Sequence, residues 1–495
     1  MYYYFQIRLL VAVVFTLIFW AFTALTLRED RGPERAPTGT RYRPLTINLM
    51  LPIYIGLWCF LMLIPGAGHV AAEQLTTSFF DVFLLLLLYF AILISLLPFL
   101  RKTFDPRICA TLWMVPNLLY ITMIGDEFME LDRPLLVIRM PEGLAAVLFW
   151  IWLTGFGIIM LYKIGVHLYF RHKVLHNARE VTDPEILQLW TDMQVSDGVS
   201  PLLSLTPVIS PYVKTPISVG CFKTTIVLVL PEAPYTMEEL ELIFRHELIH
   251  IQRQDAESKF FMAFCTALYW FNPLMWKSMK HCADDLELSC DEAVLKNASE
   301  ETRHRYASLI LQTAGNGTGF TTCLSASAEG LRYRLKNIVS PANRRTDSLI
   351  IALVFLLLFM SVGHIALAYD QLTGAEAFLT EVGEEMPQLT AIKRYAQDDD
   401  MEGTAYTCKD EAALYQYLHK LQLHKITGNY VFEPTGRYLE LCYPTNLESH
   451  ARIALSHDSL HFTPFAYGVE SSSYYYITQD IDWDYIESLL EPISH

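Results

Sequence analysis

His246-Glu247-Leu248-Ile249-His250 is the stretch that decides the fold, because it fits the pattern His-Glu-x-x-His. Two histidines four residues apart lie on one face of a helix, close enough to bind one zinc ion, and the glutamate can take a proton from a zinc-bound water. Upstream, Thr236 and Glu239 have the spacing of a capping box, and apolar residues then recur with a helical period. We therefore predict a helix that presents His246 and His250 as ligands of one Zn²⁺ per chain and Glu247 as the catalytic base.

The composition of the 495-residue chain is typical of a membrane protein, because 52% of the residues are hydrophobic and only 18% are charged. A membrane-spanning helix needs about 20 mostly apolar residues. The runs that meet or approach this length are 6–26, 46–66, 79–100, 108–124, 143–166 and 348–368. The run 108–124 is short and holds Pro116 and Asn117, so a broken or re-entrant segment is the alternative there. The net charge of −16 argues against direct nucleic-acid binding, which requires a basic surface.

The distribution of Lys and Arg between the predicted spans indicates their orientation, because basic loops stay in the cytoplasm. The intervening segments alternate between rich and poor in basic residues in the order 27–44, 67–78, 101–107, 125–142 and 167–173. The alternation is consistent if all six predicted spans cross and the N-terminus is outside. Residues 167–347 are then cytoplasmic, and residues 369–495 lie outside the membrane.

A catalytic zinc ion takes three protein ligands and leaves one position for water, so a third ligand must come from elsewhere in the chain. The segment 284–292 reads as a helix on which Asp284, Glu287 and Asp291 share one face. Packed against the first helix, Glu287 can reach the metal, and Asp291 can accept the N–H of a ligand histidine. A solvated acidic face is the alternative reading, and Cys290 is a weaker candidate ligand because it has no partner at a ligand spacing.

The apolar run 258–276 is long enough to be read as a further span. If it crossed the bilayer, Glu287 would lie on the opposite side from His246 and His250, and no shared metal site would form. We therefore predict a buried or membrane-embedded hairpin that returns to the cytoplasmic side, with its aromatic residues at the membrane face. The alternative is that Glu287 is not a ligand.

Further segments extend the pattern around the metal motif. They are Phe244 to His250, Arg253, Asp255, Trp270 to Pro273, Glu287 to Ala293, Ile217 to Gly220, Ile226 to Leu228 and Pro231. Together they resemble the BlaR/MecR family of antirepressor metallopeptidases, over residues 150–370. The resemblance implies a gluzincin-like peptidase domain with His246, His250 and Glu287 as zinc ligands and Glu247 as general base. It also implies that Asp291 and Asp255 support the ligands.

In that family a sensor domain outside the membrane detects a signal, and a cytoplasmic repressor is then inactivated, often with self-cleavage. The resemblance thus implies an external ligand, a cytoplasmic protein substrate such as a winged-helix transcriptional repressor, and self-cleavage between about 316 and 345. The best-known members end in a penicillin-binding sensor with a Ser-x-x-Lys nucleophile. Here no serine in 369–495 is followed by lysine three places on, so a β-lactam receptor is not expected.

The C-terminal region mixes helical and strand patterns and predicts a small α+β domain. The predicted helices are Glu411 to Leu423 and Ile481 to Leu490, and the predicted strands are 430–432, 438–442 and 474–477. Cys408 and Cys442 are the only cysteines beyond residue 368. A disulfide between them and two small buried thiols are both compatible with the sequence.

Taken together, the sequence predicts a mainly α polytopic membrane protein. Its parts are a transmembrane region 1–166, a cytoplasmic α+β zincin-like domain 167–347, a last transmembrane helix 348–368 and an extracytoplasmic domain 369–495. We expect a zinc endopeptidase that acts as a sensor and transducer in the lipid bilayer of a bacterial cytoplasmic membrane. A monomer and a homodimer are both compatible with the sequence. The alternatives are a constitutive quality-control metalloprotease and a receptor that keeps the zinc helix without hydrolysis.

Overall fold

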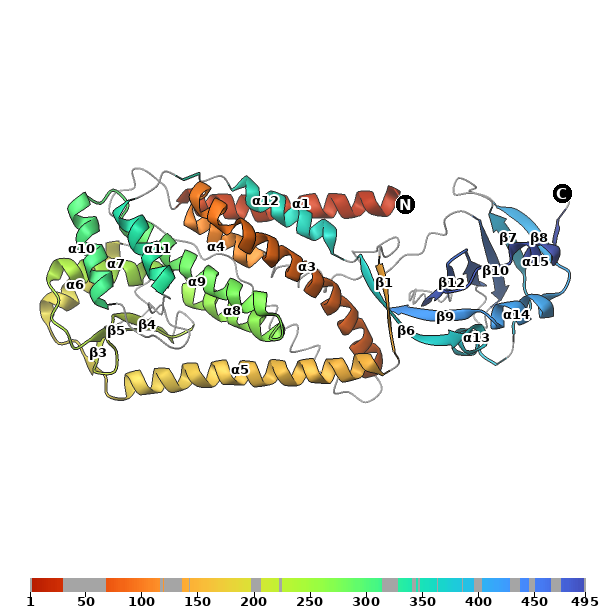
Figure 1. The fold of residues 1–495 in the computed structure, drawn as a ribbon, viewed down its shortest axis with the longest axis horizontal. Helices are drawn as coiled ribbons and strands as arrows, with labels where there is room; N and C mark the ends of the chain where they lie inside the picture. The colour runs from red at the N-terminus through yellow and green to blue at the C-terminus, as the bar shows by residue number, and fades with distance from the viewer. Residues whose placement is uncertain are drawn as a thin grey trace.

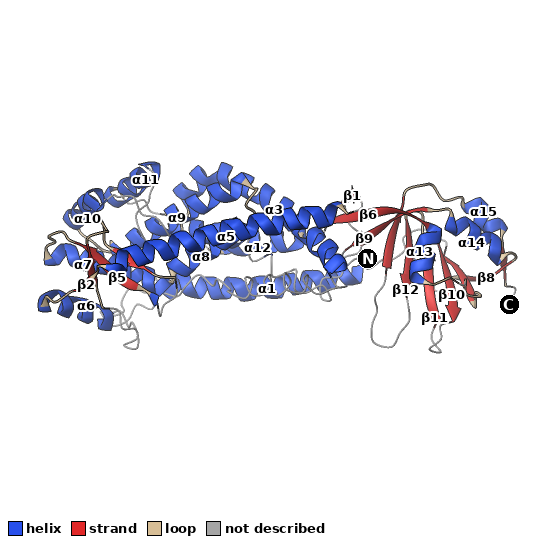
Figure 2. Cartoon of the chain, turned by 90° about the horizontal axis from the view of Figure 1, so that it is seen from below, coloured by secondary structure: helices blue, strands red, loops and turns tan. Residues whose placement is uncertain are grey.

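The computed structural model places its strands in two sheets at opposite ends of an elongated molecule, and long helices connect the two ends (Figure 1, Figure 2). The described residues are 2–29, 68–115, 119, 136–141, 143–196, 206–221, 225–313, 328–340, 344–345, 348–362, 364–384, 386–395, 403–427, 437–444, 450–463 and 473–493. The predicted span 46–66 and the predicted strand 430–432 lie outside these ranges.

The connecting helices are rich in Leu, Ile and Phe. Their bounds are α1 (Tyr2–Glu29), α3 (Gly68–Thr103), α4 (Pro106–Met114), α5 (Leu144–His176) and α12 (Leu349–Ser361). Within the described ranges, two stretches are long and apolar enough to cross a membrane, Phe80–Thr103 and Ala146–His176. Two apolar stretches are shorter, Arg8–Ala21 and Leu349–Ser361. The described part of the predicted span 108–124 belongs mainly to α4, in which every residue is buried.

Two segments next to the predicted spans differ from the expectations. Residues 68–78 of the expected loop 67–78 are helical, because α3 begins at Gly68, although its apolar stretch begins at Phe80, close to the start of the predicted span 79–100. The expected last span 348–368 is too long, because α12 ends at Ser361 and strand β6 (Ile365–Thr373) begins four residues later. The four apolar residues 365–368 are compatible by pattern with a helix or with a buried strand. In the structure they form a strand, because their backbone pairs with strands β1 (Leu136–Met140) and β9 (Gln422–Thr427).

The metal motif lies in a region whose described residues form six helices and a small sheet, at the left end in Figure 1. The strands, β2 (Arg179–Glu180), β3 (Val208–Ser210), β4 (Ile217–Val219) and β5 (Val227–Pro231), pair in the order β2-β3-β5-β4. The helices are α6 (Pro184–Ser196), α7 (Met237–Arg253), α8 (Asp255–Leu268), α9 (Pro273–Val294), α10 (Glu300–Thr313) and α11 (Ala328–Val339). The apolar face of α7 is buried in their core, and the ring of Phe244 packs edge-on against Trp190 of α6.

The apolar run 258–276 forms a turn between two antiparallel limbs and not a single straight segment. The first limb is α8, the turn covers Tyr269 to Asn272, and the returning limb is α9, which Asn272 caps by accepting from the N–H of Leu274. The turn packs on α5 at Gly155, where a Cβ atom would lie 2.2 Å from the indole ring of Trp270. The hairpin thus brings the segment with Glu287 back beside α7.

A buried carboxylate fixes α9 to the connecting helices. Asp285 is fully buried and accepts hydrogen bonds of 2.8 Å from Nε of Arg101, at the end of α3, and of 2.8 Å from Nε1 of Trp113 in α4. Because a buried carboxylate without donors is strongly disfavoured, this pair of donors sets how α9 lies against α3 and α4.

The C-terminal region builds a ten-stranded sheet with the order β1-β6-β9-β13-β12-β11-β10-β7-β8-β14. Its other strands are β1 (Leu136–Met140), β7 (Ala391–Tyr395), β8 (Thr404–Cys408), β9 (Gln422–Thr427), β10 (Tyr438–Pro444), β11 (His450–Leu455), β12 (Ser459–Thr463), β13 (Ser473–Ile477) and β14 (Leu490–Pro492). The helices of this region are α13 (Gly374–Glu381), α14 (Glu411–His419) and α15 (Trp483–Ser488). Apolar residues of these helices, such as Phe378 and Leu414, share one core with the strands.

Two details of this region differ from the expectations, and a third decides between two alternatives. β1 comes from the predicted loop 125–142 and pairs in parallel with β6, so the sheet extends beyond 369–495. The predicted helices 411–423 and 481–490 are shorter, because their last residues enter β9 and β14. Of the two alternatives for Cys408 and Cys442, the structure has free thiols and no disulfide between them, on strands that β7 separates.

Candidate metal centre

The helix α7 presents the motif as the sequence predicts. Thr236 caps it by accepting from the N–H of Glu239, whose carboxylate accepts in return from the N–H of Thr236, and this closes the capping box. At the other end Gln254 adopts a left-handed conformation with φ 55, which breaks the helix and starts α8 at Asp255 in a new direction. The break lets Asp255 turn back toward the histidines.

Both histidines point their Nε2 atoms into one buried space. Nε2 of His246 and Nε2 of His250 lie 3.1 Å apart. Nδ1 of His250 donates to Oδ2 of Asp255 over 2.6 Å. Nδ1 of His246 lies 2.9 Å from the hydroxyl of Tyr306, which itself donates to Oδ1 of Asp291 over 2.8 Å and therefore accepts from the histidine. This network assigns the proton of each imidazole to Nδ1 and leaves both Nε2 lone pairs facing the same space.

Glu287 completes the arrangement from α9. Its Oε2 atom lies 3.7 Å from Nε2 of His246 and 3.7 Å from Nε2 of His250. Oε1 accepts a 2.8 Å hydrogen bond from Lys259, whereas the buried Oε2 has no hydrogen-bond donor. Burial acts to raise the pKa of the Glu287 carboxyl, but its charged surroundings, Lys259 foremost, hold the pKa well below its usual range, so the group is an anion.

The distances between these three atoms fit one metal ion. Ligand atoms bound tetrahedrally at about 2.0–2.1 Å lie about 3.3–3.4 Å apart, and the observed separations are 3.1, 3.7 and 3.7 Å. Nη1 of Arg334 in α11 forms an ion pair of 3.3 Å with Oε2 of Glu287, but the two imidazole lone pairs that converge on this oxygen in a buried site remain costly unless a cation lies between them. The residues present therefore fit a divalent metal such as zinc.

Cys290 is a second group that is able to approach such a metal. His246, His250 and Cys290 form a buried group whose potential ligand atoms lie within 4.8 Å of one another. However, Sγ of Cys290 lies 3.4 Å from Nδ1 of His246, the nitrogen that faces Tyr306, whereas Oε2 of Glu287 is equidistant from both Nε2 atoms. The geometry around the Nε2 atoms therefore favours the carboxylate as third ligand.

Glu247 lies beside the ligands and is held by the small sheet. It is buried, and its Oε2 atom accepts a 2.5 Å hydrogen bond from the hydroxyl of Ser218 in β4. A hydroxyl donor fixes the orientation of the carboxylate. The sequence contains both residues in recognisable segments, but nothing in their spacing predicted the contact.

Two site residues carry no motif and were not predicted, Tyr306 in α10 and Arg334 in α11. Burial and the nearby Asp291 raise the pKa of Tyr306 well above its usual value, which keeps the hydroxyl protonated as a donor to Asp291. Arg334 binds both oxygens of Asp291, with Nε 2.6 Å from Oδ2 and Nη2 2.7 Å from Oδ1. Asp291 was expected to accept directly from a ligand histidine, but it lies 3.6 Å from Nδ1 of His246 and acts through Tyr306.

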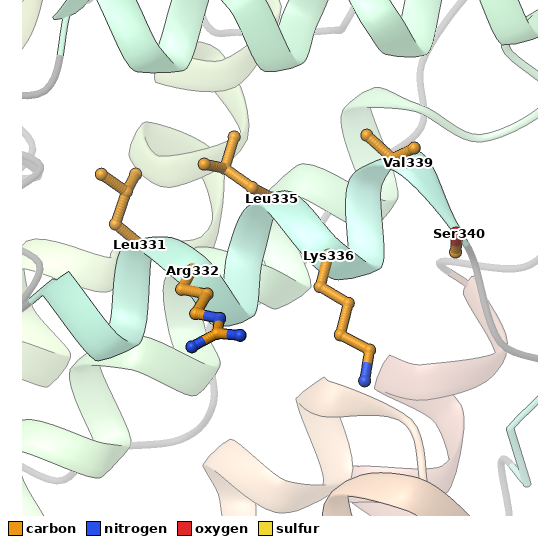
Figure 3. A pocket seen from close by; sticks show the side chains of 6 residues that line it. All are labelled: Leu331, Arg332, Leu335, Lys336, Val339 and Ser340. Carbon is orange, nitrogen blue, oxygen red and sulfur yellow. The ribbon is translucent and has the colours of Figure 1, made fainter.

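A surface groove of about 500 Å³ lies on the other side of α11. Its lining residues are Leu331, Arg332, Leu335, Lys336, Val339 and Ser340 (Figure 3). None of the predicted ligands contributes to it, so the groove is separate from the candidate metal centre.

Comparison with known proteins finds a family model and several relatives that match part of the chain. The family model described as BlaR1 peptidase M56 matches residues 48–338. The regulatory protein BlaR1 of Bacillus licheniformis is 28% identical over 220 residues, which cover 43% of this chain and 36% of that protein. The methicillin resistance mecR1 proteins of Staphylococcus aureus and Staphylococcus epidermidis are 31% identical over 102 residues, 20% of this chain and 17% of each of those proteins. The matched part thus spans about a third of the length of BlaR1 and about a sixth of the length of each mecR1 protein.

Proposed function

The chain belongs to the BlaR1 peptidase M56 family, and from this premise we propose that it is an integral-membrane zinc endopeptidase that transmits a signal by cleaving a cytoplasmic protein. The observation that carries the proposal is the triangle formed by Nε2 of His246, Nε2 of His250 and the donor-free Oε2 of Glu287. Three protein ligands with an open fourth position are the arrangement of catalytic zinc sites, whereas structural sites are closed by four ligands.

The residues around the triangle have separate tasks in the proposed reaction. When bound, Zn²⁺ would lower the pKa of a water molecule and polarise the scissile carbonyl. Glu247, oriented by Ser218, accepts the proton of the attacking water at its carboxylate and delivers it to the leaving amine. Asp255 and Tyr306 hold the Nδ1 protons, so that both imidazoles keep their Nε2 atoms free for the metal.

The placement in a membrane is part of the same proposal. The apolar stretches of α3 and α5 are long enough to cross a bilayer, and α1 and α12 contribute shorter ones. We propose that the metal centre lies in the cytoplasm and the ten-stranded sheet outside, and the distribution of basic residues between the spans supports this orientation. We propose that the sheet region receives an external ligand and that the substrate is a transcriptional repressor, by analogy with a relative whose name is regulatory protein BlaR1.

A single substitution tests the catalytic part of the proposal. Glu247→Gln removes the base but keeps the shape, so the purified chain should retain one zinc ion, measured by mass spectrometry of the metal, and lose cleavage of a candidate repressor. Glu241→Gln is the matched control, because Glu241 lies on the same helix with an exposed side chain. Wild-type cleavage by Glu247→Gln refutes the proposed mechanism. Cleavage that does not respond to removal of 365–493 would favour a constitutive quality-control protease.

A further inference from the structure

Arg334 is the buried cation that α11 inserts into the metal centre. Its side chain is 1% exposed, and Nε and Nη2 form the paired contact with Asp291. The remaining nitrogen, Nη1, has no hydrogen-bond partner among the described residues and lies 3.3 Å from Oε2 of Glu287. One guanidinium group therefore spans two carboxylates one turn apart on α9.

The contact with Glu287 involves the oxygen that faces both histidines. Lys259 holds the other oxygen of this carboxylate, Oε1, from α8. The two cations thus approach Glu287 from different helices and leave its carboxylate little freedom to rotate. The donors of a planar guanidinium point in fixed directions. Arg334 therefore sets the orientation of the Glu287 carboxylate in addition to compensating its negative charge.

The helix that carries Arg334 is itself tied to Arg344, which precedes α12 in the sequence. Arg344 donates to the side chains of Asn337 in α11 and Glu292 in α9, and its Nε donates to the carbonyl oxygen of Arg101 over 2.9 Å. Arg345 continues the connection with a 2.7 Å hydrogen bond from its N–H to the carbonyl oxygen of Thr103. The position of α11 is therefore linked, through Arg344 and Arg345, to the end of α3.

We propose that Arg334 is a positioning residue of the metal centre, through which α11 aligns Oε2 of Glu287 with the two histidines. The proposal deepens the proposed function and rests on it. It implies that the three ligands are aligned only while α11 is docked on α9.

The test measures binding of Co²⁺ to the full-length chain in detergent, by the visible absorption of the bound ion. Arg334→Ala should weaken Co²⁺ binding roughly 10- to 100-fold, the range known for residues that orient ligands. Millimolar guanidinium ion should restore part of the affinity by occupying the space of the lost side chain. Arg332→Ala is the control on the same helix, because Arg332 is exposed, and it should bind Co²⁺ like the wild type.

A second variant separates positioning from charge compensation, because Arg334→Ala leaves the carboxylate of Asp291 buried without its cation. In the double variant Arg334→Met with Asp291→Asn, the side chain at position 291 is neutral, so no carboxylate is left there without its cation. The amide oxygen at position 291 still accepts from the hydroxyl of Tyr306. Positioning predicts that this folded variant also binds Co²⁺ roughly 10-fold more weakly or worse and shows an altered absorption spectrum. Wild-type affinity and spectrum in the double variant would overturn the inference. Failure of the wild-type chain to bind Co²⁺ would instead refute the proposed function.

Discussion

The hydroxyl of Tyr306 offers a sharp test of how the metal centre is oriented. Tyr306→Phe removes one oxygen, which accepts from Nδ1 of His246 over 2.9 Å and donates to Asp291 over 2.8 Å. Asp291 keeps its paired contact with Arg334 in the variant, whereas the N–H of His246 loses its oxygen acceptor in a buried site. An unsatisfied buried donor costs about 1–3 kcal/mol.

This cost should appear mainly as weaker metal binding. Loss of a group that orients a ligand histidine reduces metal affinity by about 10- to 100-fold, which is about 1.4–2.7 kcal/mol. We expect a loss of metal affinity near the lower end of this range. The sulfur of Cys290 lies 3.4 Å from the same nitrogen and, as a weak acceptor, compensates in part for the lost hydroxyl. The assay is competition for Zn²⁺ against a chromophoric chelator, together with kcat/KM for cleavage of the candidate repressor.

Tyr333→Phe is the matched control. It also removes a phenolic oxygen, but this hydroxyl has no hydrogen-bond partner among the described residues. The ring, which stacks under Arg101, remains in place. If Tyr306→Phe binds Zn²⁺ as tightly as Tyr333→Phe and the wild type, the assigned network does not orient His246, and the reasoning about the protonated Nδ1 atoms is wrong.

Three further predictions concern the base and the packing of the helices. Ser218→Ala should lower kcat roughly 10-fold with unchanged zinc content, because a hydrogen bond to a charged group contributes about 1.5–3 kcal/mol; equal kcat would show that Glu247 needs no donor. Gly155→Ala should lower the free energy of unfolding by about 1–3 kcal/mol, because its Cβ atom would overlap an indole ring. Gly157→Ala, where nothing lies within 4 Å, should be neutral or stabilising in the same denaturation assay. Asp285→Ala should lower the free energy of unfolding by roughly 3 kcal/mol, because it leaves two buried donors without their acceptor. An unchanged melting temperature would contradict the proposed anchoring of α9.

The part of the site that the sequence could predict is the part with local periodicity. The spacing of His246 and His250 follows from one helix, and the shared face of Glu287 and Asp291 follows from another. Placing the two helices together required only the assumption of a common metal ion. That assumption also predicted that the run 258–276 turns back, and the structure has this turn at Tyr269 to Asn272.

The contributions of Tyr306 and Arg334 could not be predicted, because each is a single residue in an ordinary amphipathic helix. Their roles arise only when α10 and α11 pack beside α9. The strand β1 was missed for a related reason, since Leu136 pairs with Ile365 across more than two hundred residues of intervening chain. Pairing of such distant segments leaves no periodic signal in either one.

The parallel ladder between β1 and β6 has a mechanical consequence. Five register pairs join the strand that leads into α5 to the strand that follows α12, and Gly143, with φ 73, makes the turn into α5. α5 has 33 residues and is therefore a rod about 50 Å long. A tilt of about 5° at the end near the ladder moves the other end by about 4 Å, from the length of the rod. That far end leads into the small sheet that holds Ser218 against Glu247. A small rotation at the large sheet would thereby displace the far end of α5 by a distance comparable to a hydrogen-bond length, next to the small sheet whose strand β4 carries Ser218.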